Sequence, residues 1–473
     1  SIRAAQSAHA KYVQLQLQQA PAAAFAAEPL AAAFTTAARA AAVEATAAAA
    51  AAASTKRAAS RWKPRIVDSG DLLVASTAKP SVPGKPYYVY PTPRVNTSVA
   101  VTIVVVVTAG TQMETFATAL NTIRCYAALH SYRLSVEFDD KFKECEVHDD
   151  LFFRRHCHTH MIMQKQIPTG TWALFIDADV GVVNPNKRIE EFIEPGYEIF
   201  LFDRFYNWEY AALSYLVKNN ERGRAWVDDF AKFEFRLPPS FHGTDNGALH
   251  PFLMFYLVPE TRDPRTRSRT AELCLKIWER SSGYEDLFSM QACTRMVIGE
   301  QSHFPEQRLK IYQKGAGWVH DLWIFHSHWT TDDFMMHSLK DENLGPYPSD
   351  EANRRRCRET ALNVEDTDDC FLVFPVLQKL NVDKCKAGTE GWLMEGRLQL
   401  DNVTMKQIKD KLAKKILKQQ MEMIGRMAFK ILEEDRLRTT QRPTTPFKRK
   451  QRILAFTDDS IGASRTVPGI VAN

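Results

Sequence analysis

Two aspartates separated by one residue are the side chains of this sequence best suited to hold a metal ion. Asp177 and Asp179 directly follow the apolar run 172–176, which is typical of a strand buried on both faces. Side chains at positions i and i+2 of an extended segment point the same way, so both carboxylates could reach one cation. Carboxylate oxygens suit Mg²⁺ or Mn²⁺, and such an ion could hold a diphosphate and help it to leave.

An Asp-x-Asp sequence is weak evidence by itself, because aspartate favours turns and strand ends, and most such pairs face solvent. The residues around this pair favour a metal site. An apolar run precedes the pair, a second apolar run follows at 180–183, and Asn184-Pro185 ends the segment. In an open α/β sheet, ligands bind at the carboxyl ends of the strands, where this pair would lie.

Two carboxylates leave a metal ion short of protein ligands, and a histidine late in the chain could supply a third. His326, His328 and His337 lie close together in the sequence. A lone histidine is more often a structural residue than a ligand. Spacing alone does not choose among the three.

A second polar cluster lies between glycines in the segment 237–250, which includes Asp245 and Asn246. Polar residues in such a loop, followed by an apolar helix, are typical of a binding loop. The local sequence fits equally well an Asp or Asn N-cap at the start of that helix.

The elements that must position these residues alternate between strand and helix. The β-branched run 99–109 is expected to form a core strand, followed by a helix at 113–130 and a strand at 132–138. This order predicts a parallel sheet with right-handed crossovers. The next helix carries Arg154 and Arg155 one element before the acid pair. The sequence therefore predicts an α/β fold with a mostly parallel sheet flanked by helices.

Composition divides the chain into a body with two basic extensions. Residues 1–60 are an alanine-rich, low-complexity arm with a net charge of +3, and residues 61–98 read as a proline-rich linker. We expect a main domain at 99–345 and a C-terminal subdomain at 346–402. The extension 403–473 carries a net charge of +9, whereas the chain between the two extensions is mildly acidic.

The C-terminal extension has an amphipathic pattern. Apolar residues recur mostly at three- and four-residue steps from Met405 to Ile431, with Lys and Arg between them, which predicts a basic amphipathic helix of about eight turns. Its apolar stripe needs a partner: the chain's own body, another subunit, or a membrane surface. Few aromatic residues accompany the basic ones, so nucleic acid is the least expected partner.

The cysteines and the N-terminus bear on the compartment. The eight cysteines have no Cys-x-x-Cys spacing, which argues against a zinc site, and their even number fits disulfides in a secretory lumen as well as buried thiols. The alanine-rich, acid-poor arm is typical of organellar transit segments. The arm therefore predicts an organelle such as the mitochondrion, whereas the family resemblance described below implies the Golgi or secretory lumen, and the cysteines do not decide between them. No apolar stretch reaches the roughly 18 residues needed to cross a bilayer.

Six sequence blocks, in one order, resemble a family of uncharacterised proteins abundant in nematodes. That family is itself similar to nucleotide-sugar-dependent glycosyltransferases with the GT-A fold, a Rossmann-like α/β architecture. The resemblance covers about residues 99–340. The blocks are Arg-Arg-His-Cys (154–157), Trp-Ala-Leu-Phe-Ile-Asp-Ala-Asp-Val-Gly-Val-Val-Asn-Pro (172–185), Asp-Arg-Phe-Tyr-Asn-Trp-Glu (203–209), Ser-Phe-His-Gly-Thr-Asp-Asn-Gly-Ala-Leu-His (240–250), Gly-Trp-Val-His-Asp (317–321) and Asp-Phe-Met-Met-His (333–337).

The resemblance implies a manganese-dependent transfer from a nucleotide-sugar donor, a UDP-linked sugar, to a glycan or protein acceptor. Asp177 and Asp179 would bind the metal, and Asp177 would also contact the ribose. His337 would be the third ligand, because it is the histidine inside a family block. Arg154 and Arg155 would lie near the donor.

The resemblance also implies roles for three further residues. Lys340 would bind the diphosphate, so that the metal, Lys and Arg together neutralise the departing group. Asp245 and Asn246 would contact the transferred sugar and the acceptor.

The chain departs from the family pattern, and two functions therefore stay open. Leu213 stands where the family has glycine, and His320 and Asp332 replace two arginines. The first function is an active metal-dependent glycosyltransferase. The second is a catalytically inactive, glycosyltransferase-like accessory subunit of a large assembly, such as one in a mitochondrial membrane, held by other subunits through residues 1–98 and 403–473.

Overall fold

A computed structural model describes residues 87–89, 99–205, 207–325, 327–344, 380, 385 and 392–440. By its internal contacts the chain separates into residues 1–76 and 77–473, and all described residues belong to the second unit. The arm expected at 1–60, most of the linker expected at 61–98 and most of the subdomain expected at 346–402 lie outside the described residues, as does the end of the C-terminal extension.

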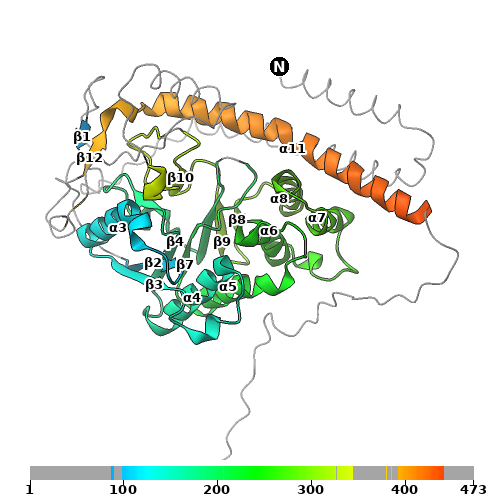
Figure 1. The fold of residues 1–473 in the computed structure, drawn as a ribbon, viewed down its shortest axis with the longest axis horizontal. Helices are drawn as coiled ribbons and strands as arrows, with labels where there is room; N and C mark the ends of the chain where they lie inside the picture. Colours follow the sequence, from blue (N-terminus) through cyan, green and yellow to red (C-terminus); the bar gives the residue numbers. More distant parts are fainter. Residues whose placement is uncertain are drawn as a thin grey trace, which may run out of the picture. The chain divides into compact units, whose positions relative to one another are not determined.

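Seven strands form the central sheet of the second unit: β2 (Val101–Val107), β3 (Arg133–Phe138), β4 (Trp172–Ile176), β6 (Ile199–Phe202), β7 (Ser214–Lys218), β8 (His303–Phe304) and β9 (Leu309–Tyr312). Their order is β3-β2-β4-β7-β6-β9-β8 (Figure 1). β7 and β8 run against the other five strands, so the sheet is mostly parallel. The expected α/β fold is confirmed.

The strands at the centre of this sheet are buried on both faces. Every residue of β2 and β4 is buried, as their almost uninterrupted apolar sequences predict for strands covered by helices. α4 packs against α5, and α8 packs against both α6 and α7. The helices are α3 (Ala117–His130), α4 (Leu151–Lys165), α5 (Glu221–Lys232), α6 (Thr244–Leu257), α7 (Arg269–Glu279) and α8 (Tyr284–Ile298), and short 3-10 helices lie at Met113–Phe116, Lys143–Cys145, Ile189–Phe192, Phe233–Arg236, Pro259–Thr261, Asp341–Asn343 and Gly396–Leu398.

A three-stranded sheet joins parts of the chain that are far apart in sequence. It consists of β10 (Val319–Asp321), β11 (Met335–His337) and β5 (Gly181–Val182), in the order β10-β11-β5. A side chain at Gly181 would place its Cβ 2.6 Å from Leu339 and 3.4 Å from the backbone of α3. Glycine at this position therefore lets β5 lie close to α3.

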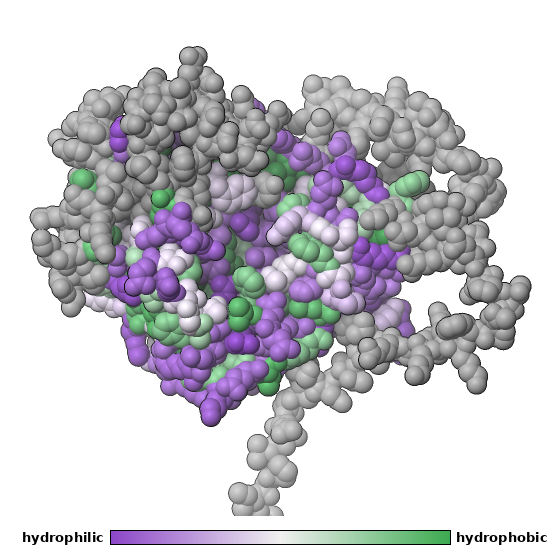
Figure 2. Space-filling view, viewed as in Figure 1, coloured by the Kyte–Doolittle hydropathy of each residue, from purple (hydrophilic) through white to green (hydrophobic). Residues whose placement is uncertain are grey.

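The C-terminal extension begins as the expected helix, α11 (Asn402–Thr440), which passes over α7 and α8 (Figure 1). Its apolar residues Met405, Leu412, Ile416, Ile424 and Ile431 are buried. Of the partners that the apolar stripe could need, the chain's own body is the one that covers it. No helix in the described residues is long and apolar enough to span a bilayer. On the face seen in Figure 2, hydrophilic residues predominate among the described ones, with separate hydrophobic patches between them.

Two further features lie near the ends of the described chain. β1 (Tyr87–Val89) falls within the segment expected to be a linker, and it pairs antiparallel with β12 (Leu393–Glu395). Disulfides link Cys145 to Cys157, Cys274 to Cys293, and Cys125 to Cys385. Cys357 and Cys370 lie outside the described residues. The first of these disulfides ties the loop before α4 to that helix, and the second ties α7 to α8.

Asp229 on α5 offers a test of this packing. Burial, with the nearby Asp228, raises the pKa of Asp229 to about 6. The native state thus holds the proton more tightly than the unfolded state, so stability is lost as the pH rises from about 4 through about 6. We expect Asp229→Asn to raise the free energy of unfolding at pH 7 by about 1–2 kcal/mol after allowance for solvent screening, and to leave it unchanged near pH 4.

The measurement is urea unfolding of both proteins at the two pH values. Asp332→Asn is the control, because Asp332 is an exposed carboxylate away from Asp229. An equal gain at both pH values, or a gain in the control, would contradict the burial of an ionised Asp229.

Candidate functional site

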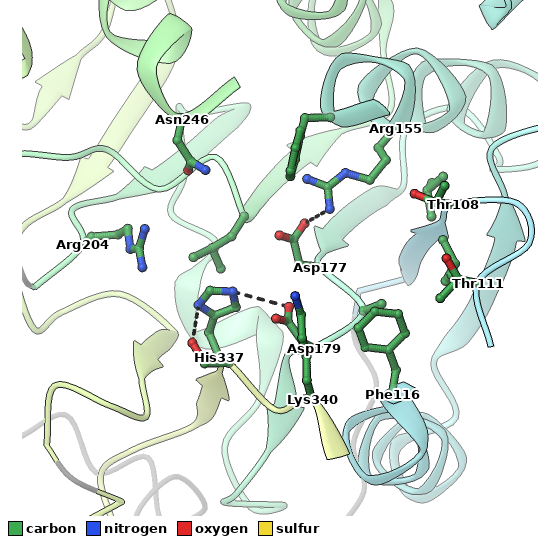
Figure 3. A pocket seen from close by; sticks show the side chains of 16 residues that line it. Thr108, Thr111, Phe116, Arg155, Asp177, Asp179, Arg204, Asn246, His337 and Lys340 are labelled. Carbon is green, nitrogen blue, oxygen red and sulfur yellow. Dashed lines mark hydrogen bonds and ion pairs between the residues drawn. The ribbon is translucent and has the colours of Figure 1, made fainter. Parts of the chain in front are cut away.

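A cavity of about 410 Å³ opens at the carboxyl ends of β2 and β4 (Figure 3). Six of the eight residues that the sequence singled out line it, whereas Arg154 and Asp245 do not. The lining residues are Val106, Val107, Thr108, Thr111, Phe116, Phe152, Arg155, Asp177, Ala178, Asp179, Arg204, Leu213, Asn246, His337, Ser338 and Lys340.

Three side chains converge at the centre of the cavity. One ligand atom from each of Asp177, Asp179 and His337 lies within 4.8 Å of the other two. The aspartates meet across a turn and not along an extended strand, since the backbone N–H of Val180 donates to the carbonyl of Asp177 at 3.1 Å. Among the described residues these three form the one group with the donor atoms and spacing of a metal site.

The three-stranded sheet carries His337 to this position. β11 pairs with β5, directly after Asp179, and the backbone N–H of Leu339 donates to the carbonyl of Asp179 at 2.9 Å. His337 Nε2 lies 3.4 Å from Asp179 Oδ1. Of the other two histidines considered, His328 is buried and its Nδ1 lies 2.9 Å from the carbonyl of Phe325, and His326 lies outside the described residues.

The acid pair attracts positive charge. Burial raises the pKa of Asp177 to about 6, with Arg155 opposing it. Burial would also raise the pKa of Asp179, but His337 and Lys340 hold it below its usual value. Burial disfavours a charge on His337, yet Asp179 and Asp321 outweigh this effect and raise the pKa of His337 to about 10. His337 therefore carries a positive charge near neutral pH when no ligand is bound.

The two arginines of α4 have different positions. Asp150 caps the helix, accepting the backbone N–H of Phe152 at 2.8 Å. Arg155 then points into the cavity and donates to Asp177 at 2.9 Å, with its guanidinium 4.8 Å from the ring of Phe152. Arg154 turns away and donates to the carbonyl of His148 at 2.7 and 3.0 Å.

Asp245 and Asn246 also differ in position, although they are neighbours at the start of α6. Asp245 is 1% exposed, and its Oδ2 lies 3.1 Å from His156 Nε2 and 3.5 Å from Arg155. Asn246 lines the cavity, and its Oδ1 is buried without a partner in the described part of the chain. Asp245 thus supports Arg155 from behind, while the amide of Asn246 faces the cavity.

Lys340 lies beside Asp179 among the residues that line the cavity (Figure 3). Its ammonium has no hydrogen bond or ion pair with any residue that the structure describes, although it lowers the pKa of Asp179. On one side of the centre the cavity is lined by Thr108, Thr111 and Phe116, and on the other side by Arg204 and Asn246.

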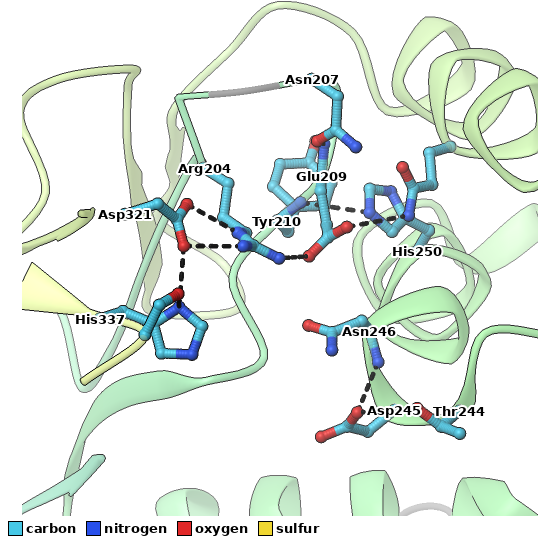
Figure 4. Close-up of polar contacts among 12 residues, drawn as sticks. Arg204, Asn207, Glu209, Tyr210, Thr244, Asp245, Asn246, His250, Asp321 and His337 are labelled. Atoms are coloured by element: carbon cyan, nitrogen blue, oxygen red, sulfur yellow. Dashed lines mark hydrogen bonds and ion pairs between the residues drawn. The ribbon is translucent and has the colours of Figure 1, made fainter. Parts of the chain in front are cut away.

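Sequence reasoning gave no role to Arg204 and Asp321, although both lie inside family blocks. Figure 4 shows Asp321 between Arg204 and His337. Asp321 Oδ1 lies 2.8 Å from His337 Nδ1, and Arg204 donates to the same carboxylate at 2.7 and 3.0 Å. Glu209 accepts a further hydrogen bond from Arg204 at 2.7 Å. No local sequence signal marks these contacts, because Asp321 lies opposite His337 only through the pairing of β10 with β11.

The three departures from the family pattern have different surroundings. Leu213 lines the cavity. His320 belongs to β10 of the three-stranded sheet and does not line the cavity. Its Nδ1 is 2.6 Å from Asp333. Asp332 is exposed and does not line the cavity. Only the leucine therefore changes the wall of the cavity.

Comparison with known proteins bears on the family. No curated protein matches the chain. The crystal structure of a glycosyltransferase involved in the glycosylation of the major capsid of PBCV-1 is similar to part of it, with 21% sequence identity, 29% of this chain and 69% of that chain covered, and a TM-score of 0.24. Likeness at this level carries no argument about activity. Residues 123–353 match the model of a family described as "Protein of unknown function, DUF273". The resemblance to an uncharacterised family is thus confirmed for residues 123–353.

Proposed function

We propose that this chain is a metal-dependent glycosyltransferase that takes a sugar from a nucleotide-sugar donor. The observation that carries the proposal is the convergence of Asp177, Asp179 and His337 in an open cavity, with Lys340 beside them. Two carboxylates and an imidazole suit Mn²⁺ or Mg²⁺. When bound there, the divalent cation would neutralise charge on a departing nucleoside diphosphate.

The chain's own residues would share this task. Lys340, whose ammonium is unpaired within the described residues, would donate to the diphosphate. Arg155 would hold Asp177 in place, and Asp245 would hold Arg155, because each of these groups is bonded to the next. This reassigns Asp245 from contact with the sugar to positioning, since it is buried behind Arg155.

The two ends of the cavity differ in chemistry, which suggests how a donor would lie. A flat base and its ribose fit the end formed by Phe116, Thr108 and Thr111, where an aromatic ring and two hydroxyls are available. Sugar hydroxyls fit the polar end, with Arg204 and Asn246. The diphosphate would then lie between them, over the metal site. A UDP-linked sugar is the donor that we propose, and the acceptor would approach from the polar end.

An inactive accessory subunit is the competing proposal. It is expected to have a blocked cleft and to use its extensions on other chains. In the described residues the cavity is open, His337 lies within metal-ligand reach of Asp179, and the apolar stripe of α11 packs on the same chain. These observations support the enzyme.

For the compartment we propose the secretory lumen over the mitochondrion. Three disulfides among the described cysteines support an oxidising environment, because cytosolic and most matrix proteins keep their thiols reduced.

The first experiment measures thermal stabilisation by nucleoside diphosphates and nucleotide-sugars, with and without Mn²⁺. A ligand at about 100 times its dissociation constant stabilises the native state by about 2.7 kcal/mol, a shift of several degrees. We expect a metal-dependent shift that is lost in Asp179→Asn. Asp332→Asn, an exposed residue outside the cavity, is the matched control and should keep the shift. No shift with any nucleotide would instead favour the inactive subunit.

A second experiment tests the metal site without a nucleotide. Asp321 orients His337 through a hydrogen bond of 2.8 Å, and removing such a partner of a metal-bound histidine weakens metal affinity by about 10- to 100-fold. We expect this loss in Asp321→Asn when Mn²⁺ binding is measured by calorimetry. Glu198→Gln, which alters a buried carboxylate paired with Arg308 away from the cavity, should bind Mn²⁺ like the wild type. Unchanged affinity in Asp321→Asn would remove Asp321 from the site.

A further inference from the structure

The guanidinium at the polar end of the cavity donates to two carboxylates through three of its five N–H groups. Arg204 donates from Nε and Nη2 to Asp321, at 3.0 and 2.7 Å, and from Nη1 to Glu209, at 2.7 Å (Figure 4). Asp321 is 4% exposed and Glu209 is 6% exposed, so solvent screens neither of them well. Arg204 thus faces two buried carboxylates, and that of Asp321 also bonds to His337.

Two further cations lie near this group, and neither faces the cavity. Arg295 is paired with Asp203 at 2.6 and 2.9 Å. Lys314 donates to the backbone carbonyls of Arg204 and Asn207, and burial lowers its pKa to about 8. Neither side chain lines the cavity. A ligand at the polar end would therefore meet no unpaired cation among the residues that the structure describes.

The other group at this end is neutral. Asn246 has no hydrogen-bond partner for its side-chain amide within the described residues, and its Oδ1 is buried (Figures 3 and 4). An amide both donates and accepts hydrogen bonds, as a sugar hydroxyl does, whereas a carboxylate only accepts. The buried Oδ1 needs a donor, and a hydroxyl can supply one but an ionised carboxylate cannot.

We infer that the polar end of the cavity selects a neutral, hydroxyl-bearing sugar and rejects a sugar that carries a carboxylate, such as a uronic acid. This inference rests on the proposed function and adds to it the class of the transferred sugar. Glu209 is its specificity-determining residue, because it supplies the second negative charge next to Arg204 and does not contact the metal ligands. The cations at the centre of the cavity do not compensate: Arg155 is held by Asp177 and Asp245, and Lys340 is assigned to the diphosphate.

The test compares UDP-glucose with UDP-glucuronic acid, which share the base and the diphosphate and differ in one carboxylate. Calorimetry in the presence of Mn²⁺ gives the dissociation constant of each. We expect the wild type to bind UDP-glucose at least about 10-fold more tightly, equivalent to about 1.4 kcal/mol.

Glu209→Gln is the decisive variant. It keeps the size of the side chain and an oxygen that accepts from Arg204, but removes one negative charge. We expect the preference for UDP-glucose to fall by at least about threefold, mainly because UDP-glucuronic acid binds more tightly. The matched control is Glu198→Gln, which also removes a buried carboxylate paired with arginine, Arg308 at 2.8 Å, but that arginine does not line the cavity as Arg204 does. Its preference should equal that of the wild type.

The outcomes separate this inference from the proposed function. If the wild type binds both nucleotides equally, or UDP-glucuronic acid more tightly, the inference is wrong and the nucleotide site stands. If the wild type binds neither in the presence of Mn²⁺, the inference falls together with the UDP-linked donor. A preference that is the same in Glu209→Gln and the wild type would also overturn the role of Glu209. The wild-type ratio decides the sugar class even if Glu209→Gln does not fold.

Discussion

Arg155 forms ion pairs with two carboxylates at once, and these contacts join α4, β4 and α6. Its guanidinium lies 2.9 Å from Asp177, at the end of β4, and 3.5 Å from Asp245, on α6. A buried charge that loses its partner is strongly destabilising, and without Arg155 two such charges would lie close together. If α4 moved away from the sheet, Arg155 would leave both carboxylates and the native state would be destabilised. Electrostatics therefore fixes α4 in addition to the packing of its apolar face.

A second group of ion pairs lies on the other side of Asp177 and Asp179, and it fixes the three-stranded sheet of β10, β11 and β5. Asp321 accepts from Arg204 and from His337, and the two cations hold the pKa of its carboxyl well below the usual range despite burial. His337 is thus oriented on one nitrogen by Asp321 and presents the other to Asp179. Groups fixed in this way before a ligand arrives lose little entropy on binding, which is what a site that must hold a charged ligand requires.

The sequence predicted the parts of this structure that depend on local pattern. The apolar run before Asp177, the alternation of strands and helices, and the helix after residue 402 are each visible in a short window. Contacts between distant segments were not predictable in that way. Asp321 meets His337 only because β10 and β11 are paired in one register, and Arg204 reaches them from a third segment. For the same reason, spacing in the sequence could not choose the third metal ligand among His326, His328 and His337.

One such long-range contact gives the C-terminal helix a place in the body. Asp333 is buried where the chain turns into β11, and its carboxylate faces His320 at 2.6 Å and Lys409, on α11, at 3.5 Å. The neighbouring His320 and Lys409 hold the pKa of Asp333 well below its usual range against the effect of burial. A histidine and a lysine from α11 thus share the buried carboxylate of Asp333. Through Lys409, α11 thereby contributes a positive charge beside the segment that carries His337. The amphipathic pattern of this helix predicted an apolar contact with a partner and did not indicate this ionic one.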